Sequence, residues 1–149
     1  MHNTIIDILD YRARFSPERK ALAGVVSASY GELRQKAIEM AGGLIDRGLK
    51  PGDRIGILEF NHASAIQLIL GCGYAGIVPV ILNWRLSKEE TLFILNDAKC
   101  KLVFAGSDFK PLVSDSAYEI VDLTADFWTP PGGASARALT LPEAKQTFL

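Results

Sequence analysis

The stretch that decides the fold is residues 50–82, KPGDRIGILEFNHASAIQLILGCGYAGIVPVIL. It opens with a turn, in which Pro51 presets one backbone dihedral and Gly52 permits a positive one. The short apolar segment Arg54–Leu58 follows directly. Because a short apolar run beside a turn signal is typical of a buried strand, we expect a strand to begin as soon as this turn is complete.

A helix and a second strand are expected in the rest of this stretch. Asn61 is the expected N-cap of an uncharged helix that runs from about His62 to Tyr74. The segment Ile77–Leu82 then reads as an unbroken apolar run, which is typical of a parallel strand covered on both faces. Strand, helix and strand in this order predict a βαβ unit.

The same region raises the alternative of a membrane span. The segment from Phe60 to Trp84 carries no charged residue and is long enough to cross a bilayer. Pro79 and the glycines at 71, 73 and 76 would break it into two pieces, because both residue types are unfavourable inside a helix. We therefore expect a buried helix followed by a strand, and no transmembrane span.

Helix starts are marked by capping boxes, in which a Ser or Thr side chain accepts a hydrogen bond from the third residue on and an acidic side chain there reaches back. Each pattern is weak alone, but their regular placement predicts successive helices. The four boxes are Thr4–Asp7, Ser29–Glu32, Ser87–Glu90 and Thr140–Glu143.

The helix after Ser29 is expected to be amphipathic and to end at Arg47-Gly48, where glycine can take a left-handed conformation. Its apolar side chains recur at helical spacing, which predicts one buried stripe. The stripe comprises Leu33, Ala37, Met40, Ala41, Leu44 and Ile45.

The remaining chain continues the alternation. We expect a helix over Lys88 to about Asp97 and strands over 101–105 and 119–123. Alternating strands and helices predict an α/β fold with a mostly parallel sheet and helices on both faces. Residues 1–128 form the predicted α/β domain, and residues 129–149 a Pro- and Gly-rich linker followed by a short terminal helix that begins near Thr140.

Composition narrows the function. The chain has 149 residues, 48% of them hydrophobic, which suits one folded domain. Its formal net charge is −1, and no cluster of basic residues predicts a nucleic-acid partner. The two cysteines, Cys72 and Cys100, and two histidines are too dispersed for a local metal site. Unpaired thiols and the lack of a signal peptide favour a cytoplasmic protein.

A G-x-G-x-x-G motif at residues 71–76 suggests dinucleotide binding, with Glu89 and Glu90 downstream. That function needs the glycines to follow a strand and open a helix, so that free N–H groups meet the pyrophosphate. Here the expected order is reversed, because the glycines close a helix and precede a strand. We interpret them as small residues that let helix and strand pack closely.

The loop Asn83-Trp84-Arg85 is the best candidate ligand site. It follows a predicted parallel strand, at the end of the sheet where ligands of open α/β folds bind. Arg85 could meet an anion and Trp84 could line an apolar pocket, although solvation and packing are the simpler roles. His62 has no evident nucleophile or carboxylate partner, and Cys72 is interpreted as a core residue. No catalytic residue emerges.

Five segments in register closely resemble the N-terminal part of the adenylate-forming acyl-CoA synthetases. The likeness runs from about Thr4 to Phe104 and fades after Gly106. The segments are Ser29-Tyr30-Gly31-Glu32-Leu33, residues 48–55 (GLKPGDRI), residues 75–80 (AGIVPV), residues 83–87 (NWRLS) with Glu90, and Asp97-Ala98-Lys99-Cys100.

The resemblance implies an ATP-dependent ligase of fatty acid metabolism, in which an acid and ATP form an acyl-adenylate and coenzyme A then displaces AMP. The family's phosphate loop, nucleotide-binding segments and catalytic lysine lie downstream of the matched region. We therefore expect this chain to bind no cofactor itself and to be inactive alone, while its parent uses ATP, Mg²⁺ and coenzyme A.

Two interpretations remain open. In one, the chain is part of a larger ligase, its partner is the remainder of that ligase, and exposed apolar surface favours a homodimer when it is alone. In the other, it is a natural short non-catalytic interaction or regulatory module. The fatty-acid class rests on the Asn-Trp-Arg-Leu loop, and aryl or amino acids stay open.

Overall fold

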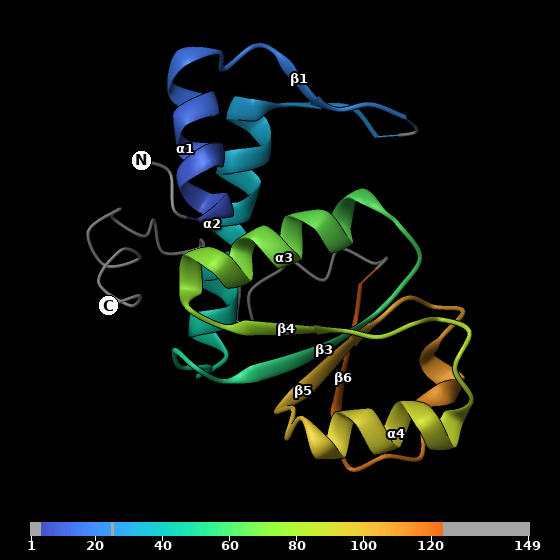
Figure 1. The fold of residues 1–149 in the computed structure, drawn as a ribbon. Helices are drawn as coiled ribbons and strands as arrows, with labels where there is room; N and C mark the ends of the chain where they lie inside the picture. The colour runs from blue at the N-terminus through green and yellow to red at the C-terminus, as the bar shows by residue number, and fades with distance from the viewer. Residues whose placement is uncertain (1–3, 25, 124–149) are drawn as a thin grey trace.

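The computed structural model describes residues 4–24 and 26–123 (Figure 1). Helices and strands alternate over most of this range. In chain order the elements are α1 (Ile5–Phe15), β1 (Lys20–Leu22), β2 (Ala28–Ser29), α2 (Tyr30–Asp46), β3 (Arg54–Leu58), α3 (Ala63–Ala75), β4 (Val78–Ile81), α4 (Lys88–Asp97), β5 (Leu102–Ala105), the 3₁₀ turn η1 (Lys110–Leu112) and β6 (Glu119–Asp122).

The central sheet has the strand order β4-β3-β5-β6, and all its pairings are parallel. Helices α1, α2 and α3 lie on one side of it and α4 lies on the other (Figure 1). Alternate residues of β3 serve the two faces: Ile57 packs with the three-helix layer and Leu58 with the α4 layer. The predicted α/β class, with helices on both faces, is confirmed.

Three capping boxes form as predicted. The side chains of Thr4, Ser29 and Ser87 each accept from the backbone N–H three residues on, and the acidic side chain there accepts from the cap N–H. The glycine after α2 also behaves as predicted, because Gly48 has φ +81°. Residues 129–149, including the fourth box at Thr140, lie outside the described residues.

The prediction that β4 is covered on both faces is wrong. β4 is an edge strand paired with β3, and Val78 and Ile81 are 46% and 66% exposed. The Val78 N–H donates to the carbonyl of Asp53, and the Leu82 N–H donates to the carbonyl of Ile57. Since backbone groups alternate in direction along a strand, the backbone groups of Pro79 and Ile81 point away from β3, toward the open edge of the sheet. A proline, which lacks an N–H, fits such an edge. Pro79 was the sequence signal that could have identified it.

Two local predictions need correction. Helix α3 is capped by His62 and not by Asn61, because His62 Nδ1 accepts from the Ser64 N–H at 3.3 Å. Ile45 is 40% exposed, although the rest of the predicted α2 stripe is buried. It lies about 100° around the helix from Leu44, at the margin of the stripe.

A partly buried polar cluster joins the three helices of one layer. The Asp10 carboxylate of α1 accepts from Arg34 Nε of α2 at 2.8 Å and from the Tyr74 hydroxyl of α3 at 2.6 Å. Burial, reinforced by the bond to Asp10, raises the pKa of Tyr74. The phenol therefore stays protonated and keeps donating to the carboxylate.

The glycines of the 71–76 motif close α3, as predicted, and Gly76 is its left-handed C-cap with φ +72°. Their packing partner differs from the prediction, because they bring α3 close to other helices and not to a strand. A Cβ at Gly71 would lie 2.7 Å from Met40 Cβ of α2, and one at Gly73 would lie 2.7 Å from Ile6 Cδ1 of α1. The motif is thus a helix-packing feature.

The small sheet of β1 and β2 and the 3₁₀ turn η1 were not predicted. Strands β1 and β2 form an antiparallel two-stranded sheet between α1 and α2, and at three and two residues they are too short to give an alternating pattern. Among the helices of the described part of the chain, none has the length and apolar character needed to cross a bilayer.

We expect Gly71→Ala to destabilise the fold by about 1–3 kcal/mol, because backbone atoms of Ala37 and Ala41 stand 3.1 and 3.2 Å from the new Cβ and α2 and α3 must separate. Gly31→Ala is the matched control. Its Cβ would make ordinary contacts of 3.4 Å or more, so the better helix propensity of alanine stabilises by up to about 1 kcal/mol. Urea unfolding midpoints test both; equal shifts would contradict the close approach at Gly71.

Candidate functional site

The sheet changes its direction of growth at β3. From β3 the chain first adds β4 on one side and then crosses to add β5 on the other. In open α/β sheets, ligands bind outside the carboxyl ends of the strands at such a switch point. The candidate site is therefore the group of loops that follow β3, β4 and β5.

Three aromatic side chains from these loops are in contact. Phe60 follows β3, Trp84 follows β4 and Phe109 follows β5. The ring centroid of Phe60 lies 5.0 Å from that of Trp84 and 4.7 Å from that of Phe109, both edge to face. Phe109 is buried, whereas Phe60 and Trp84 are 45% and 38% exposed. The row thus has an anchored end and an accessible end.

The predicted residues Asn83, Trp84 and Arg85 lie together at the accessible end. The Arg85 guanidinium carbon stands 4.1 Å from the centroid of the Trp84 ring, a cation–π distance. Asn83 Oδ1 accepts from the Arg85 N–H at 3.0 Å, which shapes the loop. All three side chains are exposed. Together they offer a cation beside an apolar, aromatic surface.

Some of the charged side chains near the carboxyl ends of the strands are paired with one another. Lys110, in η1, pairs with Asp122 at the end of β6. Within residues 4–24 and 26–123, Arg85 forms no ion pair. Its guanidinium therefore keeps its hydrogen-bonding capacity for a carboxylate or phosphate.

Glu59 and Gly106 directly follow the neighbouring strands β3 and β5, and the sequence analysis did not identify either as a site residue. Glu59 Oε1 accepts from the Phe60 N–H at 2.7 Å, while Oε2 is buried and accepts no hydrogen bond from the described residues. A Cβ at Gly106 would lie only 2.0 Å from Oε2. Both residues directly follow predicted strands, which is the signal that could have paired them.

His62 lies beside a separate pocket of about 240 Å³. The sequence prediction that it lacks a nucleophile partner is wrong, because its Nδ1 lies 2.7 Å from Ser64 Oγ. That nitrogen also caps α3, and no described carboxylate bonds to the ring, so the contact is that of a helix cap. The pocket is lined by Leu22, Ala23, Gly24, Val26, Asn61, His62, Ala63 and Ile66.

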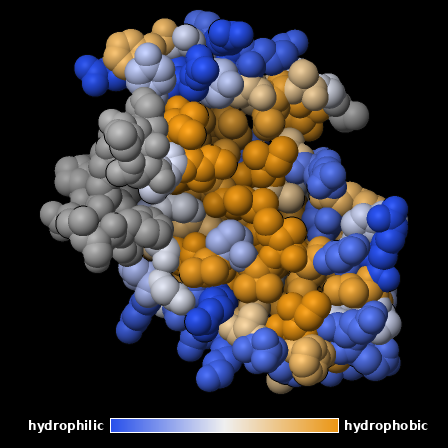
Figure 2. Space-filling view, in the orientation of Figure 1, coloured by the Kyte–Doolittle hydropathy of each residue, from blue (hydrophilic) through white to orange (hydrophobic). Residues whose placement is uncertain are grey.

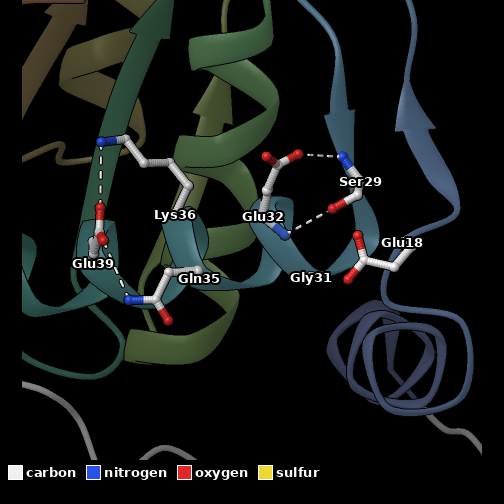
Figure 3. Close-up of a pocket in the computed structure, with 7 residues that line it drawn as sticks. All are labelled: Glu18, Ser29, Gly31, Glu32, Gln35, Lys36 and Glu39. Carbon is white, nitrogen blue, oxygen red and sulfur yellow. Dashed lines mark hydrogen bonds and ion pairs between the residues drawn. The ribbon is translucent and has the colours of Figure 1, made fainter.

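A larger open groove of about 730 Å³ lies along the first turns of α2 (Figure 3). Its polar groups bond to one another: Ser29 pairs with Glu32 in the capping box, and Lys36 Nζ lies 3.3 Å from Glu39 Oε2. Carboxylates occupy the helix start, where an anion would otherwise bind. The groove residues are Glu18, Ser29, Gly31, Glu32, Gln35, Lys36 and Glu39.

Neither cysteine has the surroundings of a nucleophile. Cys72 is fully buried in α3, and burial raises the pKa of its thiol to about 12. Burial also raises the pKa of Cys100, which is 7% exposed. The part of the chain that the structure describes contains no cluster of three or more His, Cys, Asp or Glu residues suited to a metal ion.

Comparison with known sequences gives a consistent result. The profile of the family described as AMP-binding enzymes matches residues 9–140. The 4-hydroxybenzoate–CoA/benzoate–CoA ligase of Rhodopseudomonas palustris is 34% identical over 97 residues, 65% of this chain and 18% of that protein. A feruloyl-CoA synthase of Amycolatopsis sp. is 39% identical over 88 residues, 58% of this chain and 18% of that protein. The chain thus spans about a fifth of the length of the curated relatives it matches.

Solved structures show the same similarity. The N-terminal domain of FACL13 from Mycobacterium tuberculosis matches with a TM-score of 0.80 at 26% identity, covering 93% of this chain and 38% of that one. The O-succinylbenzoate coenzyme A synthetase (MenE) of Bacillus subtilis, solved with AMP, matches with a TM-score of 0.77 at 26% identity, covering 89% of this chain and 34% of that one.

We expect Gly106→Ala to displace the Glu59 carboxylate, since the new methyl group would overlap Oε2. The bond to Phe60 N–H is then lost, the emission of Trp84 shifts, and stability falls by about 1 kcal/mol. Fluorescence in a Trp128→Phe background measures this. In the Glu59→Ala background, Gly106→Ala should have no further effect; an additive effect would disprove the coupling.

At pH 8 we expect neither cysteine of the folded chain to react with iodoacetamide within an hour, because burial shields both thiols and only about one Cys72 in ten thousand is a thiolate when its pKa is about 12. Both should react in denaturant. Ser114→Cys, at an exposed position, is the positive control and should be fully alkylated. Rapid labelling of Cys72 in the folded chain would contradict the core assignment.

Proposed function

We propose, because this chain belongs to the AMP-binding enzyme family, that it serves as the N-terminal α/β subdomain of an ATP-dependent ligase that joins a carboxylic acid to coenzyme A. The resemblance inferred from its five motifs is confirmed by the family match and by the similar solved structures. The single observation that supports the activity best is the profile match over residues 9–140. The whole reaction belongs to a longer enzyme, since the segments that align with this chain make up only 18% of the two ligases compared above.

The proposed reaction has two steps. The acid attacks ATP to form an acyl-adenylate and release pyrophosphate, and the thiol of coenzyme A then displaces AMP. Mg²⁺, when bound with ATP, would supply positive charge for the transferring phosphoryl group. The described residues do not fit that role, because they include no set of metal-ligating side chains. We assign nucleotide and metal binding to the remainder of the enzyme.

The part assigned to this chain is contact with the acid. Arg85 would pair with a carboxylate, and the exposed edges of Phe60 and Trp84 would cover an apolar or aromatic body. The relatives are named for benzoate, ferulate and fatty acid substrates. We therefore propose a carboxylic acid with an apolar or aromatic body and include fatty acids within that class. Two buried free thiols suit the reducing cytoplasm.

The remainder of the ligase would dock on the apolar face over α3 and β4. Apolar residues gather in the middle of this face (Figure 2). Of the residues of α3 and β4, Ile66, Val78 and Ile81 are at least 40% exposed. Pro79 leaves no N–H at its outward position on β4, which disfavours extension of the sheet by another strand. Side-chain packing is therefore the proposed mode of docking.

The test begins with the native transcript beyond the codon for Leu149. An open frame that encodes a Ser/Thr/Gly-rich loop followed by lysine would support the proposal, whereas a stop codon there would favour a short interaction module. ATP–pyrophosphate exchange with fatty and aryl acids should be at background for the purified 149-residue chain. Exchange above background would contradict its assignment as a non-catalytic subdomain.

In the enzyme encoded by the complete frame, we expect Trp84→Ala to raise KM for the acid about tenfold and to leave KM for ATP unchanged, because an apolar contact with the acid alone is lost. Phe93→Ala is the matched control. Phe93 is an aromatic residue of α4 that is 70% exposed and lies outside the switch-point loops. Equal effects of the two substitutions would refute the role of Trp84.

A further inference from the structure

Helix α1 carries a second apolar face that points away from the protein. Its inner face packs through Leu9, which is 5% exposed. Ile5, Ile8 and Phe15 are 62%, 50% and 62% exposed. Since successive residues are 100° apart, Ile8 and Phe15 lie nearly on one line, two turns apart and about 100–120° around the helix from Leu9, whereas Ile5 lies about 40° from Leu9, at the margin of this face. The outward surface of a helix is normally polar, so this arrangement is unusual.

Positive charge flanks this apolar face. Arg12 and Arg14 lie in the last turn of α1, and Arg19 and Lys20 follow it closely. All four side chains are exposed, and none forms an ion pair with another described residue. The Arg14 guanidinium carbon lies 5.3 Å from the centroid of the Phe15 ring. Between residues 11 and 20 the acidic residue is Glu18 alone. An occupant of this face must therefore tolerate cations and is favoured if it is anionic.

The area of the face decides between a second copy of the chain and a lipid surface. An 11-residue helix is about 17 Å long and about 10 Å wide. Its footprint is then on the order of 200 Å² per partner, far below the roughly 800 Å² per partner of a stable protein interface. A membrane surface sets no such minimum, because apolar insertion and attraction to anionic lipids add together over a single helix.

We propose that α1 lies on the surface of an anionic lipid bilayer, with Ile5, Ile8 and Phe15 at the acyl boundary and the neighbouring cations on lipid phosphates. Arg12 and Arg14 can extend their charged ends to the headgroups while their stems stay beside the apolar residues. The helix keeps its inner contacts in this position, since Leu9 and the Asp10 cluster face the protein. The binding is peripheral and needs no refolding.

The first test measures sedimentation of the 149-residue chain with lipid vesicles. We expect binding to vesicles that mix phosphatidylglycerol with phosphatidylcholine, weak binding to phosphatidylcholine alone, and loss of binding at high salt. Phe15→Ser should lower the partition coefficient about tenfold. Phe93→Ser, at the similarly exposed aromatic residue on the other side of the sheet, should leave it unchanged.

The second test addresses charge. The double variant Arg12→Gln/Arg14→Gln should lower binding to anionic vesicles at least tenfold, whereas Lys50→Gln/Lys101→Gln, a pair of exposed lysines elsewhere, should not. Urea unfolding confirms that each variant is folded. Equal binding to neutral and anionic vesicles, or equal losses in test and control variants, would overturn the proposal. So would a dimer in lipid-free buffer that Phe15→Ser abolishes, because a second copy would then cover the face.

Discussion

The parallel pairing of β3 on both of its sides is the constraint from which the other elements take their places. β4 and β5 fix its two edges, and helices cover both of its faces. Gly56 shows how closely α4 approaches, since a Cβ there would lie 2.5 Å from Leu95 Cδ2. Because β4 and β5 lie on opposite sides of β3, the chain must cross from one side of β3 to the other. The loop after β3 therefore leads to one face of the sheet, and the loop after β5 leads to the other. The switch-point site is a product of that topology.

A second determinant of the fold is the hydrogen-bonded cluster that joins α1, α2 and α3. Asp10 receives hydrogen bonds from Arg34 and Tyr74, two residues that lie on different helices. Apolar packing alone would let α1 slide along α2 and α3, because dispersion contacts have little directional preference. Charge-assisted hydrogen bonds have a defined geometry. They set the rotation of α1 and with it the direction in which the outer face of that helix points.

Local signals in the sequence predicted local structure well. The boxes at Thr4, Ser29 and Ser87 and the left-handed Gly48 each involve residues within one turn, so their geometry follows from neighbouring residues. The edge position of β4 depends on which distant strands pair, and a run of apolar residues does not carry that information. The candidate site was predictable in part: Asn83, Trp84 and Arg85 follow a recognisable strand, but the contact between Glu59 and Gly106 spans two strands that only the fold brings together.

The pairing of β3 with β5 also orders events during synthesis. Ile55 pairs with Leu102, so β3 leaves the ribosome well before its central partner is made. At roughly 5–20 residues per second, translation alone separates the two strands by several seconds. During that interval one backbone edge of β3 has only water, a chaperone or another nascent chain to bond to. Helices α1, α2 and α3 are all made before β5 and can cover one face of β3 in this interval, but the open backbone edge waits for β5 itself.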